Sequence, residues 1–80
     1  MTVAELPFPL RVRCVRVFML PKRRWSLVSH PDKITLIFRR QLTHADVTRA
    51  CRYGQTVGLL ITATPDRRGL ECVPAAENGQ

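Results

Sequence analysis

The stretch from Lys33 to Thr64 constrains the fold most, because it places a capped helix between two strongly apolar segments. The flanking segments read KITLIFRRQ and QTVGLLITAT, and neither alternates cleanly between apolar and polar residues. Such runs are typical of strands that are at least partly covered on both faces. We therefore predict the order strand, helix, strand, with both strands central in a sheet.

The predicted helix carries signals at both of its ends. Thr43 is a favoured N-cap residue, and Asp46 occupies the reciprocal position of a capping box. Leu42 and Val47 have the spacing of a hydrophobic staple. Gly54 is predicted as the residue that follows the helix, because glycine adopts the left-handed conformation at low cost. Such a helix is about three turns long and needs packing against the strands to be stable.

The two flanking strands leave apolar side chains on the face that one helix cannot cover. Side chains alternate along a strand, which places Ile37 and Leu60 opposite the faces assigned to the helix. These residues need a second layer, a partner subunit or a ligand. On this ground we expect a two-fold homodimer.

The segment from Leu10 to Leu20 is predicted as a first strand. Arginines alternate with apolar residues as far as Cys14, as in a half-buried strand. The register then changes, and a β-bulge at Cys14–Val15 would restore it. Residues 1–8 are predicted to be a flexible lead-in, since Pro7 and Pro9 disfavour regular structure.

The remaining elements are short. Residues 25–29 and 33–39 are predicted to form a hairpin around the turn His30-Pro31-Asp32. Residues 70–73 are predicted as a final edge strand, and residues 75–80 as a flexible tail. The fold class is therefore α+β: one domain over residues 9–74, with a small mixed sheet of four to five strands and one helix packed on one face, in β-β-β-α-β-β order.

Charge is the strongest compositional signal. Thirteen Lys and Arg residues face six acidic ones, which gives a net charge of +7, and eleven of the thirteen are arginine. Such a balance favours anionic partners, and arginine suits forked recognition of phosphate or carboxylate. The alternative is that codon bias supplies the arginines. The candidate binding residues are Lys22, Arg23, Arg24, Arg39, Arg40, Arg49, Arg52, Arg67 and Arg68.

The sequence lacks the patterns of an active site. It has no phosphate-binding loop, no dinucleotide-binding motif and no nucleophile elbow, and its six acids are isolated from one another. His44 and Cys51 share a helix face, but a zinc site normally needs four ligands. We expect a non-enzymatic protein without metal or cofactor.

The cysteines and the N-terminus indicate the compartment. Cys14, Cys51 and Cys72 are odd in number and far apart, which favours reduced thiols rather than a disulfide scaffold. The N-terminal residues lack the features of a signal peptide, and no apolar run is long enough to span a membrane. A cytoplasmic protein is expected.

Two functions follow from the charge. The preferred one is a small regulatory protein that binds nucleic acid, DNA or RNA, mainly through phosphates. The alternative is a protein-interaction module, an inhibitor or adaptor, that docks on an acidic surface of a partner protein. Nucleic acid requires the arginines on one continuous face, whereas a protein dock can use one basic patch beside exposed apolar surface. Trp25 beside the Lys22–Arg24 cluster could stack on a base, but we expect it in the core because it starts an alternating strand.

Overall fold

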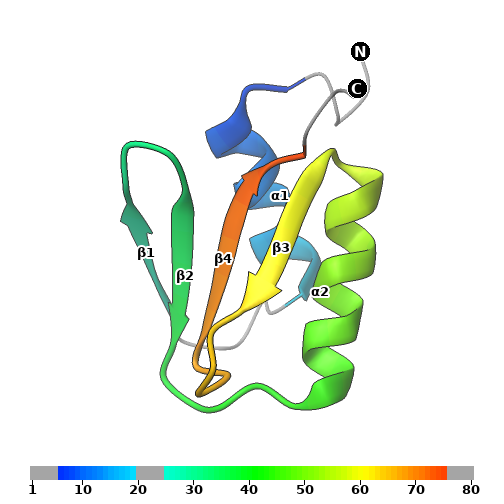
Figure 1. Ribbon diagram of the computed structural model, residues 1–80. Coiled ribbons are helices and arrows are strands. Elements are labelled where there is room, and N and C mark those ends of the chain that lie inside the picture. Colours follow the sequence, from blue (N-terminus) through cyan, green and yellow to red (C-terminus); the bar gives the residue numbers. More distant parts are fainter. Residues whose placement is uncertain (1–5, 20–24, 76–80) are drawn as a thin grey trace.

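The computed structural model describes residues 6–19 and 25–75 (Figure 1). Its elements follow the order α-β-β-α-β-β and are α1 (Phe8–Met19), β1 (Trp25–Ser29), β2 (Ile34–Phe38), α2 (His44–Thr56), β3 (Leu59–Ala63) and β4 (Gly69–Pro74). The strands form one four-stranded sheet, and both helices lie on the same face of it. The α+β class is confirmed.

The predicted hairpin is present as β1 and β2, which pair antiparallel with Leu27 opposite Leu36. Ile34, Leu36 and Phe38 are buried toward the helices, whereas Ile37 is exposed on the other face. Trp25 is partly buried and packs against the core, as expected. Alternation along a short apolar strand was therefore sufficient to assign its faces.

The start of α2 is also as predicted. The Thr43 side chain accepts a hydrogen bond from the Asp46 backbone N–H, and the Asp46 carboxylate accepts one from the Thr43 N–H, both at 3.1 Å. Leu42 and Val47 both pack on the hydrophobic core. The predicted end is wrong: the helix continues through Gly54 to Thr56, and Gly58, with φ of 73°, takes the left-handed conformation instead.

Replacing Thr43 with alanine is expected to lower the free energy of unfolding by about 1 kcal/mol, because the Asp46 N–H loses its acceptor. Denaturant melts measure the change. Thr48→Ala is the matched control: Thr48 is exposed within the same helix, so removing its hydroxyl is expected to be neutral or slightly stabilising. Equal midpoints for wild type and Thr43→Ala would contradict a cap at this residue.

The sheet is antiparallel throughout, in the order β1-β2-β4-β3, so the expected mixed sheet is wrong. β4, predicted as an edge strand, lies between β2 and β3, and β3 is an edge strand rather than a central one. The β3–β4 connection explains this: Thr64 N–H donates to Gly69 O at 2.9 Å, closing a short turn. The chain turns back after β3, so β4 pairs with β3 on one side and with β2 on the other.

The segment predicted as a first strand is helix α1, so neither the strand nor its bulge exists, and the sheet carries two helices rather than one. Leu10 N–H donates to Pro7 O at 3.0 Å and Arg11 N–H to the same oxygen at 3.1 Å, which starts the helix. Pro9 is tolerated there because first-turn N–H groups need no partner within the helix. Val12 and Val15, three residues apart, are buried against the sheet.

Hydrogen bonds from an arginine and a thiol join the helices to β3 and to the residue before it. Arg11, on α1, donates from Nη1 to Gly58 O at 2.9 Å, just beyond the end of α2. Positive charge is favoured there by the helix dipole. Cys51, on α2, donates from Sγ to Ile61 O at 3.1 Å.

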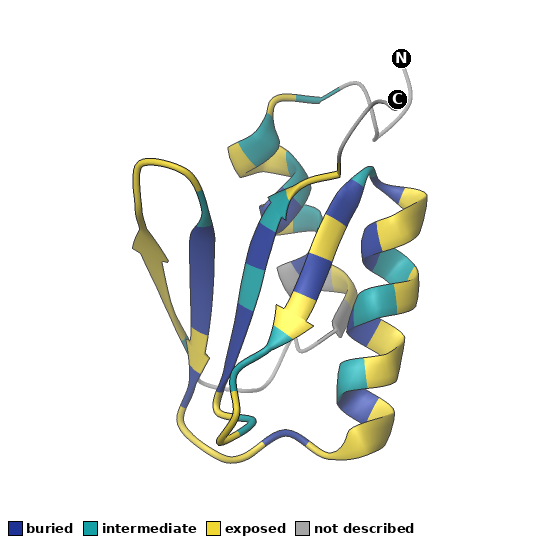
Figure 2. Ribbon diagram, in the orientation of Figure 1, coloured by how far each residue is buried: buried dark blue, intermediate teal, exposed yellow. Residues whose placement is uncertain are grey.

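The two faces of the sheet differ in cover. Leu59 and Ile61 are buried under α2, while Leu60 between them is exposed; Figure 2 shows this alternation along β3. The expected partial cover of the second face is therefore found on β2, where Thr35 is only 9% exposed, but not on β3. We call the uncovered side the open sheet face.

Candidate functional site

The described acidic residues mostly have structural partners. Asp46 belongs to the α2 cap, and Glu71 pairs with Lys33 at 3.1 Å. Asp66 accepts from Thr64 Oγ1 at 2.6 Å and from the Arg68 N–H at 3.0 Å, and these bonds lower the pKa of its carboxyl. Among the described residues, no group of three or more His, Cys, Asp or Glu is placed to hold a metal ion. All three cysteines are free thiols.

Four of the predicted binding residues come together at one end of the sheet. Arg39 and Arg40 follow β2, and Arg67 and Arg68 lie in the β3–β4 turn. Two backbone hydrogen bonds of 2.7 Å join these segments, from Phe38 N to Arg68 O and from Leu42 N to Arg67 O. We call these four residues the sheet-end arginines; all are exposed except Arg67, which is half-buried.

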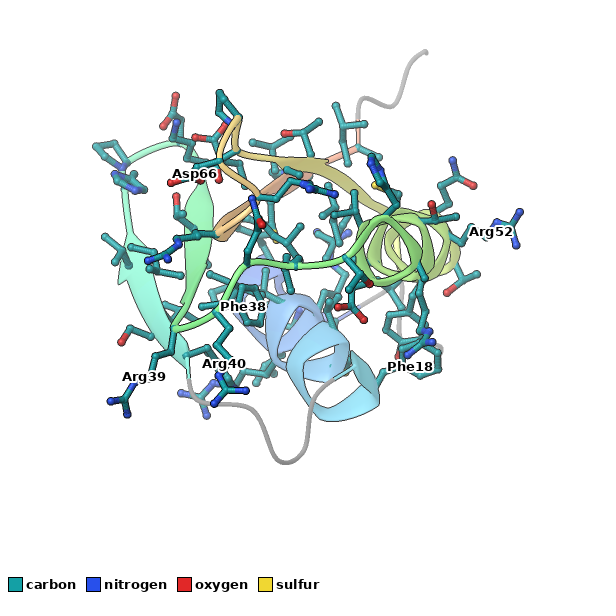
Figure 3. All side chains as sticks on the ribbon, turned by 90° about the horizontal axis from the view of Figure 1, so that it is seen from below. Phe18, Phe38, Arg39, Arg40, Arg52 and Asp66 are labelled. Carbon is teal, nitrogen blue, oxygen red and sulfur yellow. The ribbon has the colours of Figure 1, made fainter. Side chains whose placement is uncertain are left out.

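The other predicted residues do not join this group. Arg49 and Arg52 are exposed on α2, and because the helix extends to Thr56 they lie in its middle rather than in its last turn. Seen from below in Figure 3, Arg52 projects from one side of the molecule and Arg39 and Arg40 from the other. Lys22, Arg23 and Arg24 lie outside the described residues.

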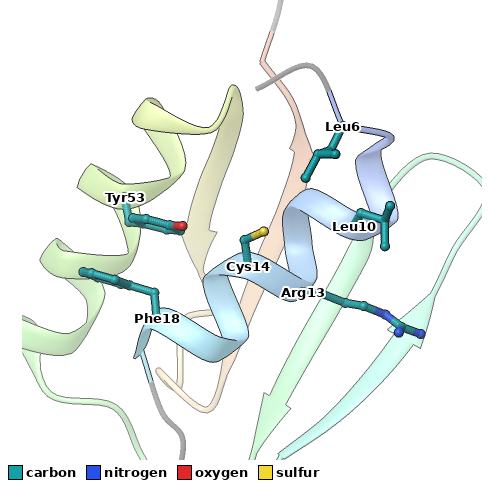
Figure 4. Close-up of a pocket in the computed structure, with 6 residues that line it drawn as sticks. All are labelled: Leu6, Leu10, Arg13, Cys14, Phe18 and Tyr53. Atoms are coloured by element: carbon teal, nitrogen blue, oxygen red, sulfur yellow. The ribbon is translucent and has the colours of Figure 1, made fainter. Parts of the chain in front are cut away.

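The sequence did not reveal an apolar groove along the outer side of α1. A hollow of about 540 Å³ is lined by Leu6, Leu10, Arg13, Cys14, Phe18 and Tyr53 (Figure 4). The rings of Phe18 and Tyr53 stack with centroids 4.2 Å apart and planes 4° from parallel, which joins α1 to α2. Leu10 and Phe18 are 44% and 50% exposed.

A second hollow, of about 600 Å³, continues from the same ring pair across α2. It is lined by Phe18, Ala45, Thr48, Arg49, Arg52, Tyr53 and Thr56. We call the two hollows together the helical groove. Its centre is aromatic, and its polar rim on the α2 side includes two of the predicted binding arginines.

The helical groove is cationic as well as apolar. Arg49 and Arg52 line it on α2, and Arg13 extends from the Leu10 end in Figure 4. Among the described residues that line either hollow, none is acidic. An apolar surface bordered by exposed guanidinium groups can bury hydrophobic side chains and pair with carboxylates at the same time.

One signal in the sequence could have revealed half of this groove. Leu6, Leu10, Cys14 and Phe18 recur every four residues, which is the spacing of one helix face. The pattern became visible only once the segment was known to be helical, and Tyr53 joins it through the tertiary fold.

None of the helices that the structure describes is long and apolar enough to cross a membrane. Comparison of the chain with family models, curated proteins and solved structures finds no match.

Proposed function

We propose that this protein is a non-enzymatic interaction module, and that its helical groove docks on an acidic surface of a partner protein. One observation carries the proposal: Arg49 and Arg52 border the stacked rings of Phe18, which is half exposed, and Tyr53, which is partly buried. This arrangement matches the requirement for a protein dock, which is a basic patch beside exposed apolar surface.

The apolar side chains and the arginines of the groove would contribute to binding in different ways. Burying the exposed halves of Leu10 and Phe18 would contribute roughly 2 kcal/mol, since full burial of such a side chain contributes about 1.5–3 kcal/mol. The arginines would raise the association rate with an acidic partner, because opposite charges attract over a distance. They would also disfavour binding of basic proteins, because like charges repel. A transient complex suits a regulatory inhibitor or adaptor.

Nucleic-acid binding, preferred on the sequence, becomes the second candidate. The sheet-end arginines favour it, since four arginines meet there beside a single exposed aspartate, Asp66. A phosphate backbone needs a continuous basic track, however, and Arg52 projects on the opposite side from Arg39 and Arg40. Among the described residues the two basic groups are separate, which favours the protein partner.

We further propose that the protein acts in the cytoplasm. The three free thiols support this, because a reducing compartment keeps cysteines unpaired. An acidic protein of the same compartment is then the expected partner.

Two variants separate the candidates by experiment. Arg49→Gln/Arg52→Gln removes the groove arginines, and Arg39→Gln/Arg40→Gln removes the same charge from the sheet end. The protein probe is a labelled helical peptide with leucines on one face and glutamates beside them, followed by fluorescence anisotropy. We expect the groove variant to bind it roughly tenfold more weakly, at about 0.7 kcal/mol per lost charge pair, and the sheet-end variant to bind like wild type.

The nucleic-acid probe is a mixed set of DNA and RNA oligonucleotides at two salt concentrations. If wild type binds them and ignores the peptide, the second candidate is correct. In that case the sheet-end variant should bind all sequences more weakly, with the log–log salt slope reduced by roughly one unit per lost contact. Absence of peptide binding even at low salt would overturn the proposed use of the groove.

A further inference from the structure

The open sheet face is a second exposed apolar surface, on the opposite side of the molecule from the helices. Its outward positions are Ser26, Val28, Thr35, Ile37, Leu60, Thr62, Gly69, Glu71 and Val73. Val28, Ile37 and Leu60 are 37%, 46% and 57% exposed, on three different strands. Thr35 and Gly69 on the same face are buried, so these three side chains are the large exposed apolar groups of the face.

The charge of this face differs from that of the whole chain. Among its nine outward positions only Glu71 is charged, and Lys33 neutralises it at 3.1 Å. Arg39, Arg40 and Arg52 project on the side of the helices or at the edges in Figure 3. The open sheet face is therefore close to neutral on a protein of net charge +7.

Neutrality decides which occupant fits. An acidic partner gains no charge pairing here, since Lys33 is already paired, and it is served better by the arginines of the helical groove. Two copies of a protein with charge +7 repel each other, so they can approach only through a face that lacks unpaired cations. The open sheet face meets that condition, and the helical groove does not.

We propose that the open sheet face packs against the same face of a second copy, in a two-fold dimer. A two-fold interface buries the same surface patch on both copies, so the patch must be complementary to itself. A neutral face meets this condition, because the two copies do not bring like charges together. Two sheets packed face to face lie about 10 Å apart and interdigitate their side chains. By the register of the strands, Ile37 and Leu60 would lie near opposite ends of the interface, with Glu71 and its partner Lys33 between them.

The size of the face sets the strength of the dimer. Strands about 4.8 Å apart with a rise of about 3.3 Å per residue give the four-stranded face a footprint of roughly 320 Å² on each copy, or roughly 630 Å² for the two. This area is about half of the roughly 1,200 Å² at which stable standard interfaces begin. A weak dimer is the consequence. Screening of the +7 charge by salt should strengthen it.

Sedimentation of the full chain tests the proposal, from micromolar to near-millimolar concentration, at low and at high salt. With increasing protein concentration, the measured mass is expected to rise from 9.1 kDa toward twice that value. At high salt the rise is expected at a lower protein concentration. The open-face variant Ile37→Lys/Leu60→Lys is expected to remain monomeric. The matched control Leu10→Lys/Leu27→Lys changes two side chains of similar exposure, 44% and 40%, away from this face and should still dimerise.

Three results would overturn the proposal: a monomer at every concentration, a dimer that the open-face variant preserves, or a dimer that both variants abolish equally. Circular dichroism of each variant checks that it is folded. If the lysine variant unfolds, Ile37→Thr/Leu60→Thr replaces it, because threonine favours strands and is polar. The open-face variant leaves every residue of the groove unchanged, so failure of the proposed function would not alter its expected result.

Discussion

Replacing Gly54 with valine is expected to lower the free energy of unfolding by about 3 kcal/mol, because the buried space beside this glycine is already filled. A Cβ atom at Gly54 would lie 2.7 Å from Cδ1 of Ile61 and 3.1 Å from the carbonyl oxygen of Leu59. The end of the Ile61 side chain can rotate away. The Leu59 oxygen belongs to the backbone of β3, so α2 itself would have to shift.

The neighbouring residue supplies the matched control. Gln55→Val places the same β-branched side chain at an exposed position of the same helix, and we expect it to cost under about 1 kcal/mol. Urea melts of both variants measure the difference. If Gly54→Val is no more destabilising than Gln55→Val, then α2 does not need a glycine to approach β3.

Gly54 also shows where reasoning from sequence fails. The chain has glycines at 54 and 58, and either could follow the end of a helix. The choice depends on Ile61, which packs where the Gly54 side chain would be, and this contact joins two elements. The helix start was predictable because Thr43 and Asp46 each form a hydrogen bond with the other's backbone, three residues away in the sequence.

Helix α1 was missed for a related reason. Its valines favour strands in isolation, and the alternation of arginine with apolar residues fits a period of two as far as Cys14. The helix forms because Val12 and Val15 both reach the core that β2, β3 and β4 leave uncovered. Packing against the core therefore outweighed the strand preference of the valines. The sheet order differs from the predicted one in part because the predicted first strand is absent.

For the candidate site, the sequence indicated which arginines are exposed but not how they are grouped. Surface exposure of Arg39, Arg40, Arg49 and Arg52 followed from their positions outside the apolar pattern. Their division between two sides of the molecule depends on how α2 crosses the sheet. The apolar half of the site was hidden, because Phe18 belonged to a segment assigned to the wrong element.

The free energy of unfolding is expected to fall steeply at alkaline pH because of Cys72. This side chain is fully buried in the core, and burial, followed by the nearby Cys51, raises the pKa of its thiol from 9.0 to about 12. Below pH 9 both the folded and the unfolded chain keep this proton, so stability does not depend on it. Above pH 9 the unfolded chain releases the proton while the folded chain retains it.

The unfolded state then binds fewer protons, and stability falls by about 1.4 kcal/mol for each pH unit until the folded thiol also ionises. The contribution of Cys72 to this loss reaches roughly 3 kcal/mol at pH 11, two units above the unfolded pKa. Urea melts under reducing conditions, at intervals between pH 8 and pH 11, measure the slope.

Two alanine variants isolate this thiol from every other group that titrates in the same range. Cys72→Ala removes it, so the variant is less stable at pH 8 because of the cavity but loses less stability as the pH rises. Cys14→Ala removes a half-buried thiol from the helical groove and serves as the control for the loss of a thiol outside the core. The same slope for Cys72→Ala and wild type would mean that the core admits the thiolate, which contradicts the packing of β4 between β2 and β3 beneath the two helices.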